Sequence, residues 1–372
     1  MKFVCSKKKL VQAIQTVSKA TASNPQTPIL GGICMTAEND TIVLEATDNE
    51  IGIRCTIEAD VSDNGSIVLM GRTAQDVFRR LPGEDVNLDY SLEEKLEHIK
   101  TGPSNYTLLA MDASAFPHII RIEPQEAVSF TVTNKDLDDL IRRTVPACGT
   151  DIRRPVFTGC LLDLNSGSVT MAATDTHRLS IKTLMISEGP ERPRKVIIPA
   201  KALKEIQHLL ASDVPTDIRV SCSPNKITFE MEGIFITNRL IEGQFPDYKR
   251  VMPQNLPINV TLNTADFLSA VERVSLVTRQ SEYNIIRLSF SGDKVRITAK
   301  NPEIGEAKEQ VDAKVEGGEL DIAFNAAFVT DALQAITGKE FLFQLDKPLS
   351  TSIIRETEDT SFLYMITPVR TR

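Results

Sequence analysis

The residue types best suited to chemistry stand together in one short segment, from Thr174 to Leu179 (TDTHRL). Asp175 and His177 lie two positions apart at the end of a predicted strand, and a carboxylate and an imidazole at that spacing could share acid–base chemistry. The alternative is a turn in which Asp175 accepts hydrogen bonds from backbone amides while His177 lines a surface groove. The two hypotheses predict different uses for the same carboxylate.

A second copy of this segment helps to decide between them. Asp48 stands at the matching place in an earlier stretch of the chain, where Glu50 replaces the histidine. An aspartate that two copies share without a shared histidine favours a structural turn or a binding surface over a catalytic pair. A hydrolase that uses Asp175 and His177 is kept as a rival hypothesis, because short motifs discriminate poorly on their own.

Other signatures of catalysis or cofactor binding are missing from the sequence. It contains no G-x-x-x-x-G-K-[ST], no G-x-G-x-x-G, no H-E-x-x-H and no G-x-S-x-G motif. Its four histidines are too dispersed for an obvious metal cluster; they are His98, His118, His177 and His208. We therefore expect no catalytic residue, no cofactor and no metal.

Length and composition are those of a globular protein with more than one domain. The 372 residues correspond to two or three domains, with 41% hydrophobic and 25% charged residues. No stretch approaches the roughly 20 apolar residues of a membrane span. The six cysteines are scattered and none forms a C-x-x-C pair, which is typical of reduced, buried thiols in the cytoplasm. The net charge of −8 argues against a protein that holds nucleic acid by charge alone.

The chain repeats itself three times, and the starts of the repeats show this first. In each, a short strand leads through a helix-capping residue (Ser6, Thr133 or Asn263) into a helix with one apolar face. The first apolar positions of these helices stand 127 residues apart (10 to 137) and then 130 residues apart (137 to 267). Similar steps of this size indicate complete domains, because solenoid repeats have only about 20–45 residues.

Three further landmarks keep the same step. The ends of matching strands read Ala-Thr-Asp at 46–48, Ala-Thr-Asp at 173–175 and Ala-Lys-Asn at 299–301. Predicted strands at 66–70, 195–198 and 320–324 are each followed by a helix, beginning near Arg72, Ala200 and Ala326. Ala115-Phe116-Pro117 matches Gln244-Phe245-Pro246. Four landmarks in register predict one fold used three times.

We expect an α+β protein made of three tandem domains, at 1–122, 127–252 and 256–372. Each would hold two helices packed on antiparallel sheets, because helices and strands do not alternate strictly. The joints fall near 121–127 and 251–257, which are rich in proline and polar residues.

Basic residues are more informative by position than by number. On the predicted helices the cations that lie away from the apolar stripe are Lys8, Lys19, Arg72, Arg79, Arg80, Lys135, Arg142, Arg143, Lys201, Lys204 and Arg273. Equivalent helices in a tandem would share one side, and such a row could face phosphates without reading bases. The alternative is an ordinary solvated helix face, since Asp139 and Glu272 dilute the row and the last helix carries no cation.

Several segments together resemble one known family. They are Thr27-Pro28-Ile29-Leu30, Arg154-Pro155-Val156-Phe157-Thr158-Gly159, the TDTHRL segment at 174–179, Glu242-Gly243-Gln244-Phe245-Pro246-Asp247-Tyr248, Asn301-Pro302-Glu303 with Glu306-Ala307, and Tyr364-Met365-Ile366-Thr367-Pro368-Val369-Arg370. In this order, along the whole chain, they resemble the bacterial DNA polymerase III beta subunit, the sliding clamp.

The resemblance implies a homodimer in which two three-domain crescents join head to tail as a six-domain ring. Helices would line a hole that encircles double-stranded DNA without sequence preference, and sheets would form the outer wall. The ring would tether the replicative DNA polymerase and make synthesis processive, a clamp loader would open it, and other polymerases and repair proteins would bind through linear motifs. Such a ring is held by topology, so a net charge of −8 suits a body that must slide.

The family's partner-peptide groove lies between the second and third domains. Carried over position by position, it would comprise Phe157, Thr174, Thr176, His177, Arg178, Leu179, Pro246, Arg250, Val251, Thr367, Pro368, Val369 and Arg370. The sequence departs from the family pattern at Thr176, where glycine is general, and at Thr367, where an apolar residue is common. Asn24 stands where some relatives carry a DNA-contacting arginine, and the tail continues to residue 372.

The resemblance also suggests residues for the other surfaces. Arg153 and Arg154 are the best candidates for direct DNA contact. At the dimer interface, Tyr106 and Leu108 of one subunit would face Val277, Thr278 and Ile285 of the other. A peptide-binding scaffold that acts independently of DNA is the alternative function.

Overall fold

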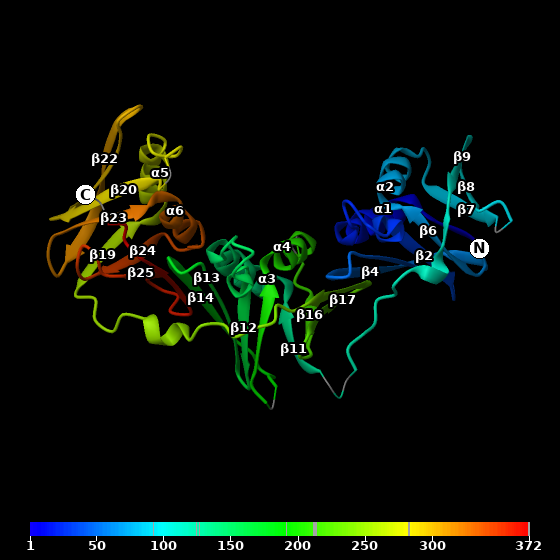
Figure 1. Ribbon diagram of the computed structural model, residues 1–372, viewed down its shortest axis with the longest axis horizontal. Helices are drawn as coiled ribbons and strands as arrows, with labels where there is room; N and C mark the ends of the chain where they lie inside the picture. Colours follow the sequence, from blue (N-terminus) through cyan, green and yellow to red (C-terminus); the bar gives the residue numbers. More distant parts are fainter. Residues whose placement is uncertain are drawn as a thin grey trace. The chain divides into compact units, whose positions relative to one another are not determined.

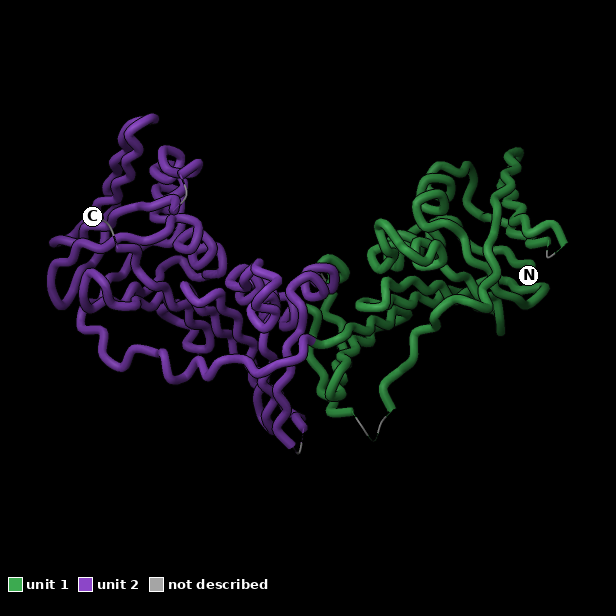
Figure 2. Tube along the Cα trace, in the orientation of Figure 1, with its two compact units in different colours: residues 1–134, 208–240 green, residues 135–207, 241–372 purple. Residues whose placement is uncertain are grey.

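The computed structural model describes residues 1–91, 93–123, 125, 127–190, 192–210, 214–281 and 283–370, so the last two residues of the expected third domain lie outside it. The chain forms two compact units (Figure 2). Unit 1 comprises Met1–Asn134 and His208–Leu240, and unit 2 comprises Lys135–Gln207 and Ile241–Arg372. The middle repeat thus contributes strands to both units, and the expected domain boundaries stay a prediction.

Unit 1 contains a five-stranded sheet of order β5-β1-β7-β8-β9 and a nine-stranded sheet of order β10-β6-β2-β3-β4-β18-β17-β16-β11 (Figure 1). Its helices are α1 (Lys7–Val17) and α2 (Gly71–Arg80). Its strands are β1 (Lys2–Ser6), β2 (Gly32–Glu38), β3 (Thr41–Thr47), β4 (Ile51–Glu58), β5 (Asp60–Asp63), β6 (Gly65–Met70), β7 (Asp85–Ser91), β8 (Leu96–Thr101), β9 (Ser104–Leu109), β10 (Met111–Asp112), β11 (Val128–Thr133), β16 (Asp217–Cys222), β17 (Lys226–Met231) and β18 (Ile234–Arg239).

Unit 2 is organised around a twelve-stranded sheet of order β15-β12-β13-β14-β26-β25-β24-β19-β22-β21-β20-β23. Its helices are α3 (Asn134–Thr144) and α4 (Ala200–Leu209), each of which extends by a residue or two into unit 1, with α5 (Thr264–Ser275) and α6 (Ala326–Gln334). Its strands are β12 (Gly159–Asn165), β13 (Ser168–Thr174), β14 (Arg178–Met185), β15 (Arg194–Pro199), β19 (Ile258–Asn263), β20 (Ile285–Ser291), β21 (Lys294–Asn301), β22 (Gly305–Glu316), β23 (Leu320–Asn325), β24 (Glu340–Leu345), β25 (Ser352–Glu356) and β26 (Phe362–Ile366).

The predicted α+β fold with tandem copies is confirmed in its elements. The helices expected near Arg72, Ala200 and Ala326 begin at Gly71, Ala200 and Ala326, each directly after a strand. Neighbouring strands pair antiparallel, as in β2 with β3 and β12 with β13. Asn263 caps α5 by accepting a hydrogen bond from the Asp266 amide at 3.0 Å, whereas Ser6 occupies the cap position of α1 without a side-chain cap bond.

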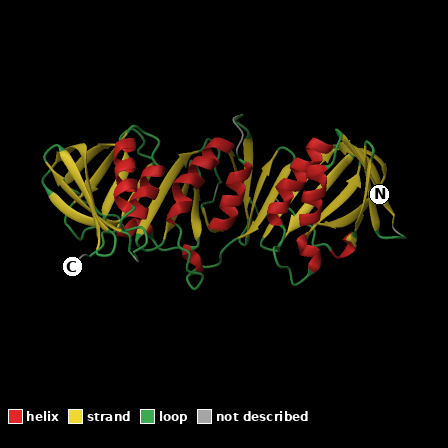
Figure 3. Cartoon of the chain, turned by 90° about the horizontal axis from the view of Figure 1, so that it is seen from above, coloured by secondary structure: helices red, strands yellow, loops and turns green. Residues whose placement is uncertain are grey.

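The core lies between the helices and the sheets, with helices on one face of the strands in each unit (Figure 3). In α1 the apolar stripe Leu10, Ala13, Ile14 and Val17 is buried, as its spacing predicts. In unit 2 the core around α5 rests on phenylalanines: Phe267 lies 5.6 Å from Phe341 and Phe290 lies 5.7 Å from Phe343, ring centroid to ring centroid. All six cysteines are described, and each is buried and forms no disulfide. No helix in the described part of the chain is long and apolar enough to cross a membrane.

Two joints between repeats are made by backbone pairing of strands. In unit 1, β4 pairs antiparallel with β18, and in unit 2, β14 pairs antiparallel with β26. The strands β4, β14 and β22 begin at residues 51, 178 and 305, so they stand at the same place in the three repeats. We call the β4–β18 pairing the first joint and the β14–β26 pairing the second joint.

A buried carboxyl in β8 predicts how stability depends on pH. Glu97 is 0% exposed, and within the described residues neither of its oxygens has a hydrogen-bond partner. Burial raises its pKa to about 8, with the N-terminal ammonium opposing the rise and Asp89 adding to it. The folded chain therefore keeps a proton that the unfolded chain loses, and the free energy of unfolding falls as pH rises from about 4.5 to about 8.

Glu97→Gln removes this titration. We expect the free energy of unfolding of the variant, measured by urea at fixed protein concentration, to gain on the parent by roughly 3–5 kcal/mol between pH 5 and pH 9. The exposed turn variant Glu232→Gln is the control and should keep the parent's pH profile. Parallel profiles for Glu97→Gln and the parent would contradict the assignment.

Candidate functional site

The turn that carries Asp175 is a structural turn shared by all three repeats. The Asp175 Oδ1 atom accepts hydrogen bonds from the amides of His177 at 2.9 Å and Arg178 at 3.0 Å. Asp48 Oδ1 accepts in the same way from the amides of Glu50 at 3.0 Å and Ile51 at 2.8 Å. In the third repeat, Asn301 Oδ1 accepts from the Glu303 amide at 2.9 Å. The carboxylate of Asp175 is thus committed to shaping the loop that presents His177.

The same turn holds an unusual backbone conformation. Thr176 has φ +81°, and Asn49, its equivalent in the first repeat, has φ +74°. Asparagine tolerates this left-handed region, but a β-branched threonine there is strained. Thr174 braces the loop, because its hydroxyl donates to the Arg178 carbonyl at 2.6 Å and accepts from the Thr176 amide at 3.1 Å.

Arg178 is the buried centre of the site. Its Nε donates to Asp175 Oδ2 at 2.9 Å, and its Nη1 donates to the Tyr364 hydroxyl at 3.1 Å and to Asp331. The guanidinium also lies 4.3 Å from the ring centroid of Phe328. Burial lowers the pKa of Arg178, but Tyr364, Asp331 and Asp175 outweigh it and leave the pKa raised. The arginine therefore stays charged and ties β14 to α6 and β26.

His177 and the chain's end form an exposed edge beside this centre. The imidazole of His177 stacks on Phe328 with ring centroids 6.5 Å apart and 20° between the planes. The amide of Thr367 donates to the His177 carbonyl at 2.9 Å, and the Thr367 hydroxyl donates to the same oxygen. The amide of Val369 donates to the Ala323 carbonyl at 2.8 Å, so the tail is held along the edge of β23.

The remaining groove candidates lie on two loops. Phe157 is half-buried beneath the guanidinium of Arg154, which stands 5.4 Å from the ring centroid. Val251 is 59% exposed, and Arg250 is exposed and pairs with Asp247 at 2.9 Å. Pro246 is exposed, Pro368 is half-buried and Arg370 is exposed. These side chains are available to a ligand in unit 2.

Leu179 is too buried to line the predicted groove, and this corrects the prediction. It is 1% exposed and belongs to a core cluster with Phe245, Tyr248 and Met365, so it supports the groove from below and does not line its surface. Sequence reasoning also missed Phe328, Asp331 and Tyr364, which position His177 and Arg178. The only local signal for Phe328 was its place one turn after the helix cap Asn325.

The candidate DNA-facing residues differ in how free their charges are. Those with exposed side chains are Arg72, Arg79, Arg80, Lys135, Arg153, Arg154, Lys201, Lys204 and Arg273. Among these, Arg273 already forms a two-point ion pair with Glu309 at 2.6 Å, and Arg153 pairs with Asp151 at 2.9 Å. Arg142 is half-buried and pairs with Asp139 at 2.6 Å.

The prediction that Arg143 is an exposed helix cation is wrong. It is 4% exposed, and its guanidinium pairs with Asp139 at 2.7 Å and with Glu356 at 2.8 Å. The Phe362 ring centroid lies 4.9 Å away. Burial lowers the pKa of Arg143 and the hydrogen bonds and charges of Asp139 and Glu356 raise it, with a net rise. The residue stabilises the second joint and is not on a DNA-facing surface.

The candidate dimer residues are partly at free edges. Tyr106 and Leu108 lie on β9, the edge strand of its sheet, and Tyr106 is 40% exposed. On the other side Val277 is half-buried, but Thr278 is 3% exposed and donates to Asn284 at 3.0 Å. Ile285 begins β20, which pairs with β21 and β23 on its two sides. Thr278 is therefore a core residue, while Ile285 pairs with Asn325 of β23 and the pairing with β21 begins only at Arg287.

The strain at Thr176 gives a test of the site's geometry. Thr176→Gly should raise the free energy of unfolding by about 1 kcal/mol, because glycine adopts φ near +80° without steric cost. Urea denaturation measures the change. Thr176→Ala keeps the Cβ atom and should show no such gain; an equal gain for both variants would mean that the backbone angle is not the source of strain.

Comparison with known proteins places this geometry in a family. Three domain profiles of the DNA polymerase III beta subunit match the chain: the N-terminal domain at residues 1–120, the central domain at 131–247 and the C-terminal domain at 249–370. Beta sliding clamps of Staphylococcus epidermidis and Staphylococcus aureus are each 33% identical to the chain, with both chains covered completely.

Solved structures agree over the whole length. The DNA polymerase sliding clamp of Bacillus subtilis superposes with a TM-score of 0.95 at 30% identity. The clamp of Pseudomonas aeruginosa gives 0.93 at 26% identity, and the beta subunit of Thermotoga maritima gives 0.90 at 25% identity, each with 100% of both chains covered. With matching profiles in all three parts of the chain and full-length relatives at 33% identity, the chain belongs to the DNA polymerase III beta subunits, the bacterial sliding clamps.

Proposed function

We propose that this chain is a non-catalytic sliding clamp that closes with a second copy into a ring around duplex DNA and tethers the replicative polymerase. Family membership over the full length supports the proposal. The observation that carries it furthest is the pair of strand edges left open at the two ends of the tandem, β9 and β22. A chain whose copies can close on each other suits topological retention on DNA.

The joints inside the chain indicate how two copies would close. β18 and β26 join the preceding repeat by pairing with β4 and β14. Their counterpart in the first repeat is β9, which in the described structure pairs with β8 alone. The counterpart of β4 and β14 is β22, whose described partners are β21 over residues 305–312 and β19 over residues 313–316. One copy's β9 and another's β22 therefore lack the partner that each of their counterparts has.

The register of that contact follows from the repeat. Ile51 lies opposite Asn238 at the first joint, and Arg178 lies opposite Ile366 at the second. In the proposed pairing of β22 with β9 of a second copy, the corresponding positions are Gly305 and Leu108. This register sets Ala307 opposite Tyr106 of the second copy. Leu276, at the end of α5 and 59% exposed, joins Val277 as a candidate for the apolar contact.

The charge of the chain suits a ring that slides. A closed ring needs no strong grip on phosphate, and each firm contact would steepen the salt dependence of binding and slow movement. A net charge of −8 with exposed cations on α2, α4 and the 151–154 loop combines weak attraction with solubility. Arg153 and Arg154 are the proposed direct contacts with DNA.

The groove beside His177 is the proposed partner site. It offers the aromatic faces of His177 and Phe328 and the exposed Val251, with Arg250 and Arg370 to orient a peptide. The polymerase, the clamp loader, and other polymerases and repair proteins with short linear motifs would compete for it in the cytoplasm. No catalytic residue is proposed, because Asp175 is committed to its turn and to Arg178.

Paired cysteines test the proposed register. Tyr106→Cys with Ala307→Cys, expressed in one chain and mildly oxidised, should give a covalent dimer on a non-reducing gel, since residues directly opposite in an antiparallel pair have Cβ atoms about 5 Å apart. Thr107→Cys with Ala307→Cys is the matched control, because a shift of one residue points the side chain to the other face. Equal cross-linking by both pairs would refute the register.

Retention on DNA tests the function. Loaded by a clamp loader onto nicked circular DNA, the protein should stay bound through gel filtration and be lost when the circle is cut. Binding to linear DNA alone should be weak and should decline steeply with salt. Equal release from circular and linear DNA, with peptide binding intact, would support a DNA-independent scaffold instead. Arg153→Ala with Arg154→Ala should shorten the residence time on circles.

A further inference from the structure

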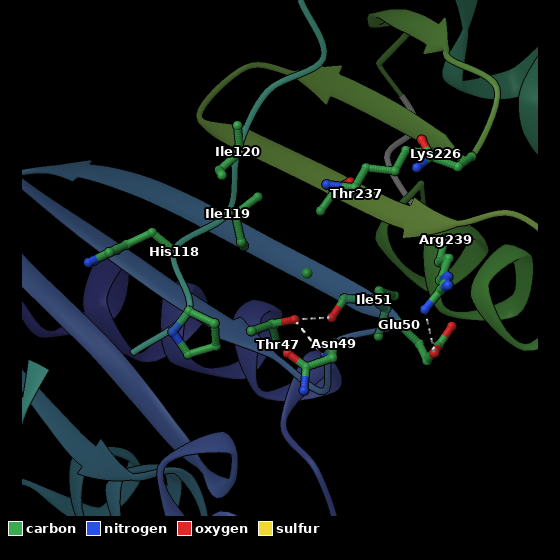
Figure 4. A pocket seen from close by; sticks show the side chains of 13 residues that line it. Thr47, Asn49, Glu50, Ile51, His118, Ile119, Ile120, Lys226, Thr237 and Arg239 are labelled. Carbon is green, nitrogen blue, oxygen red and sulfur yellow. Dashed lines mark hydrogen bonds and ion pairs between the residues drawn. The ribbon is translucent and has the colours of Figure 1, made fainter. Parts of the chain in front are cut away.

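A pocket lies at the first joint, within unit 1. It has a volume of about 270 Å³ and is bordered by β4, by the 117–120 segment and by β17 and β18. Figure 4 shows Ile119 and Ile120 on one side of the opening, Lys226 and Thr237 on another, and Glu50 facing Arg239. We call this the first-joint pocket.

The first-joint pocket occupies the place in the first joint that the His177 groove occupies in the second. Residues 47, 49, 50 and 51 line it and lie 127 positions before Thr174, Thr176, His177 and Arg178. Pro117 lines it and corresponds to Pro246 of the matching Phe-Pro motif. Arg239, one residue past the end of the joint pairing, corresponds to Thr367. The residues that line this pocket therefore stand at the positions of the first joint that match the proposed His177 groove at the second.

The walls of the first-joint pocket are built in place by close packing. A Cβ atom at Gly52 would lie 2.9 Å from Ile119 Cγ1 and 3.0 Å from Thr237 Cγ2, so this close approach requires glycine. Ile119 is held by its amide, which donates to Glu45 at 3.4 Å, and by its carbonyl, which accepts from Arg54 at 2.5 Å. The pocket is therefore preformed, which lowers the entropy lost on binding.

The pocket offers an apolar surface next to cations. Ile120 is 69% exposed, while Ile51 at 4% and Ile119 at 6% form a packed floor. Arg239 stands 4.0 Å from Glu50, at the outer limit of an ion pair. Lys226 lies directly beside Arg239 on the neighbouring strand and has no ion-pair partner among the residues that the structure covers. The Nδ1 atom of His118 lies 2.9 Å from the carboxylate of Glu45. Among the residues that line the pocket, the two cations Lys226 and Arg239 stand beside a single carboxylate, that of Glu50.

We propose that the first-joint pocket is a second docking site, which takes a short protein segment with an acidic side chain next to an aliphatic one. The carboxylate would lie between Lys226 and Arg239, and the aliphatic side chain would cover Ile120. Charge complementarity favours this occupant. Lys226 and Arg239 outnumber Glu50 in the pocket, although the chain as a whole has a net charge of −8. Binding here does not depend on DNA or on ring closure, so its failure would leave the proposed clamp function untouched.

Methyl NMR of the full-length protein tests the proposal. The probes are acetyl-Asp-Ile-Leu-Asp-amide and, with the charge reversed, acetyl-Lys-Ile-Leu-Lys-amide, titrated against protein labelled at isoleucine δ1 methyls. The acidic peptide should shift the Ile119 and Ile120 resonances with millimolar affinity, and the basic peptide should leave them in place. Assignment comes from Ile119→Val and Ile120→Val.

Charge reversal provides the matched comparison. Lys226→Glu should weaken binding of the acidic peptide, followed at the Ile120 methyl resonance, at least about tenfold, or about 1.4 kcal/mol. Lys294→Glu makes an equal change of charge at an exposed position on β21 and should leave the affinity unchanged. Unchanged isoleucine resonances elsewhere establish that the variant is folded. Shifts confined to isoleucines outside the first-joint pocket, or equal shifts with both peptides, would overturn the proposal.

Discussion

The interaction on which the structure depends is the antiparallel pairing of strands across repeat boundaries. At the first joint Ile51–Cys55 pairs with Ile234–Asn238, and at the second Arg178–Lys182 pairs with Phe362–Ile366. Backbone hydrogen bonds continue each sheet from one repeat into the next. Among the described residues the same rule leaves β9 and the 305–312 part of β22 each with one unpaired edge, and these are the edges proposed to close with a second copy.

Polar side chains make the second joint specific. Arg143 bonds Glu356 at 2.8 Å and Lys182 bonds Asp359 at 2.7 Å, while Arg178 reaches Asp331 and Tyr364. Only Arg143 and Glu356 are both buried, and breaking a buried pair by removing one partner costs several kcal/mol. The other contacts add further links among β14, α6 and β26. The loop that presents His177 is thus attached to a joint held by several polar contacts.

The two joints show how one architecture acquires different surfaces. The second joint places His177, Phe328 and Arg178 beside the tail, whereas the first places Glu50 and Ile51 at the corresponding positions. The Asx turn is common to both because Asp48 and Asp175 satisfy the same backbone amides. Repetition therefore fixes the backbone of the turn at both joints, and the side chains at a few positions give each joint a different surface.

The sequence predicted what depends on local pattern and missed what depends on distant partners. Strand–helix order, the Asn263 cap and the Asp turn follow from residues a few positions apart, and the structure confirms them, whereas Ser6 makes no side-chain cap bond. Arg143 reads as an exposed helix cation until Glu356, 213 residues away, is found beside it. Leu179 reads as a groove residue, but Phe245 and Met365 cover it. Thr278 is buried and donates a hydrogen bond to Asn284, which no periodicity in the sequence indicates.

Hydrogen exchange at the strand edges tests the central claim most directly. In a dilution series, the outward-facing amides of β9 and of β22 between residues 305 and 312 should be protected when the protein is concentrated. They should exchange rapidly when it is dilute, while β4 and β18 stay protected throughout. If the β9 edge exchanged rapidly at every concentration, the open edges would not be the surfaces through which two copies close.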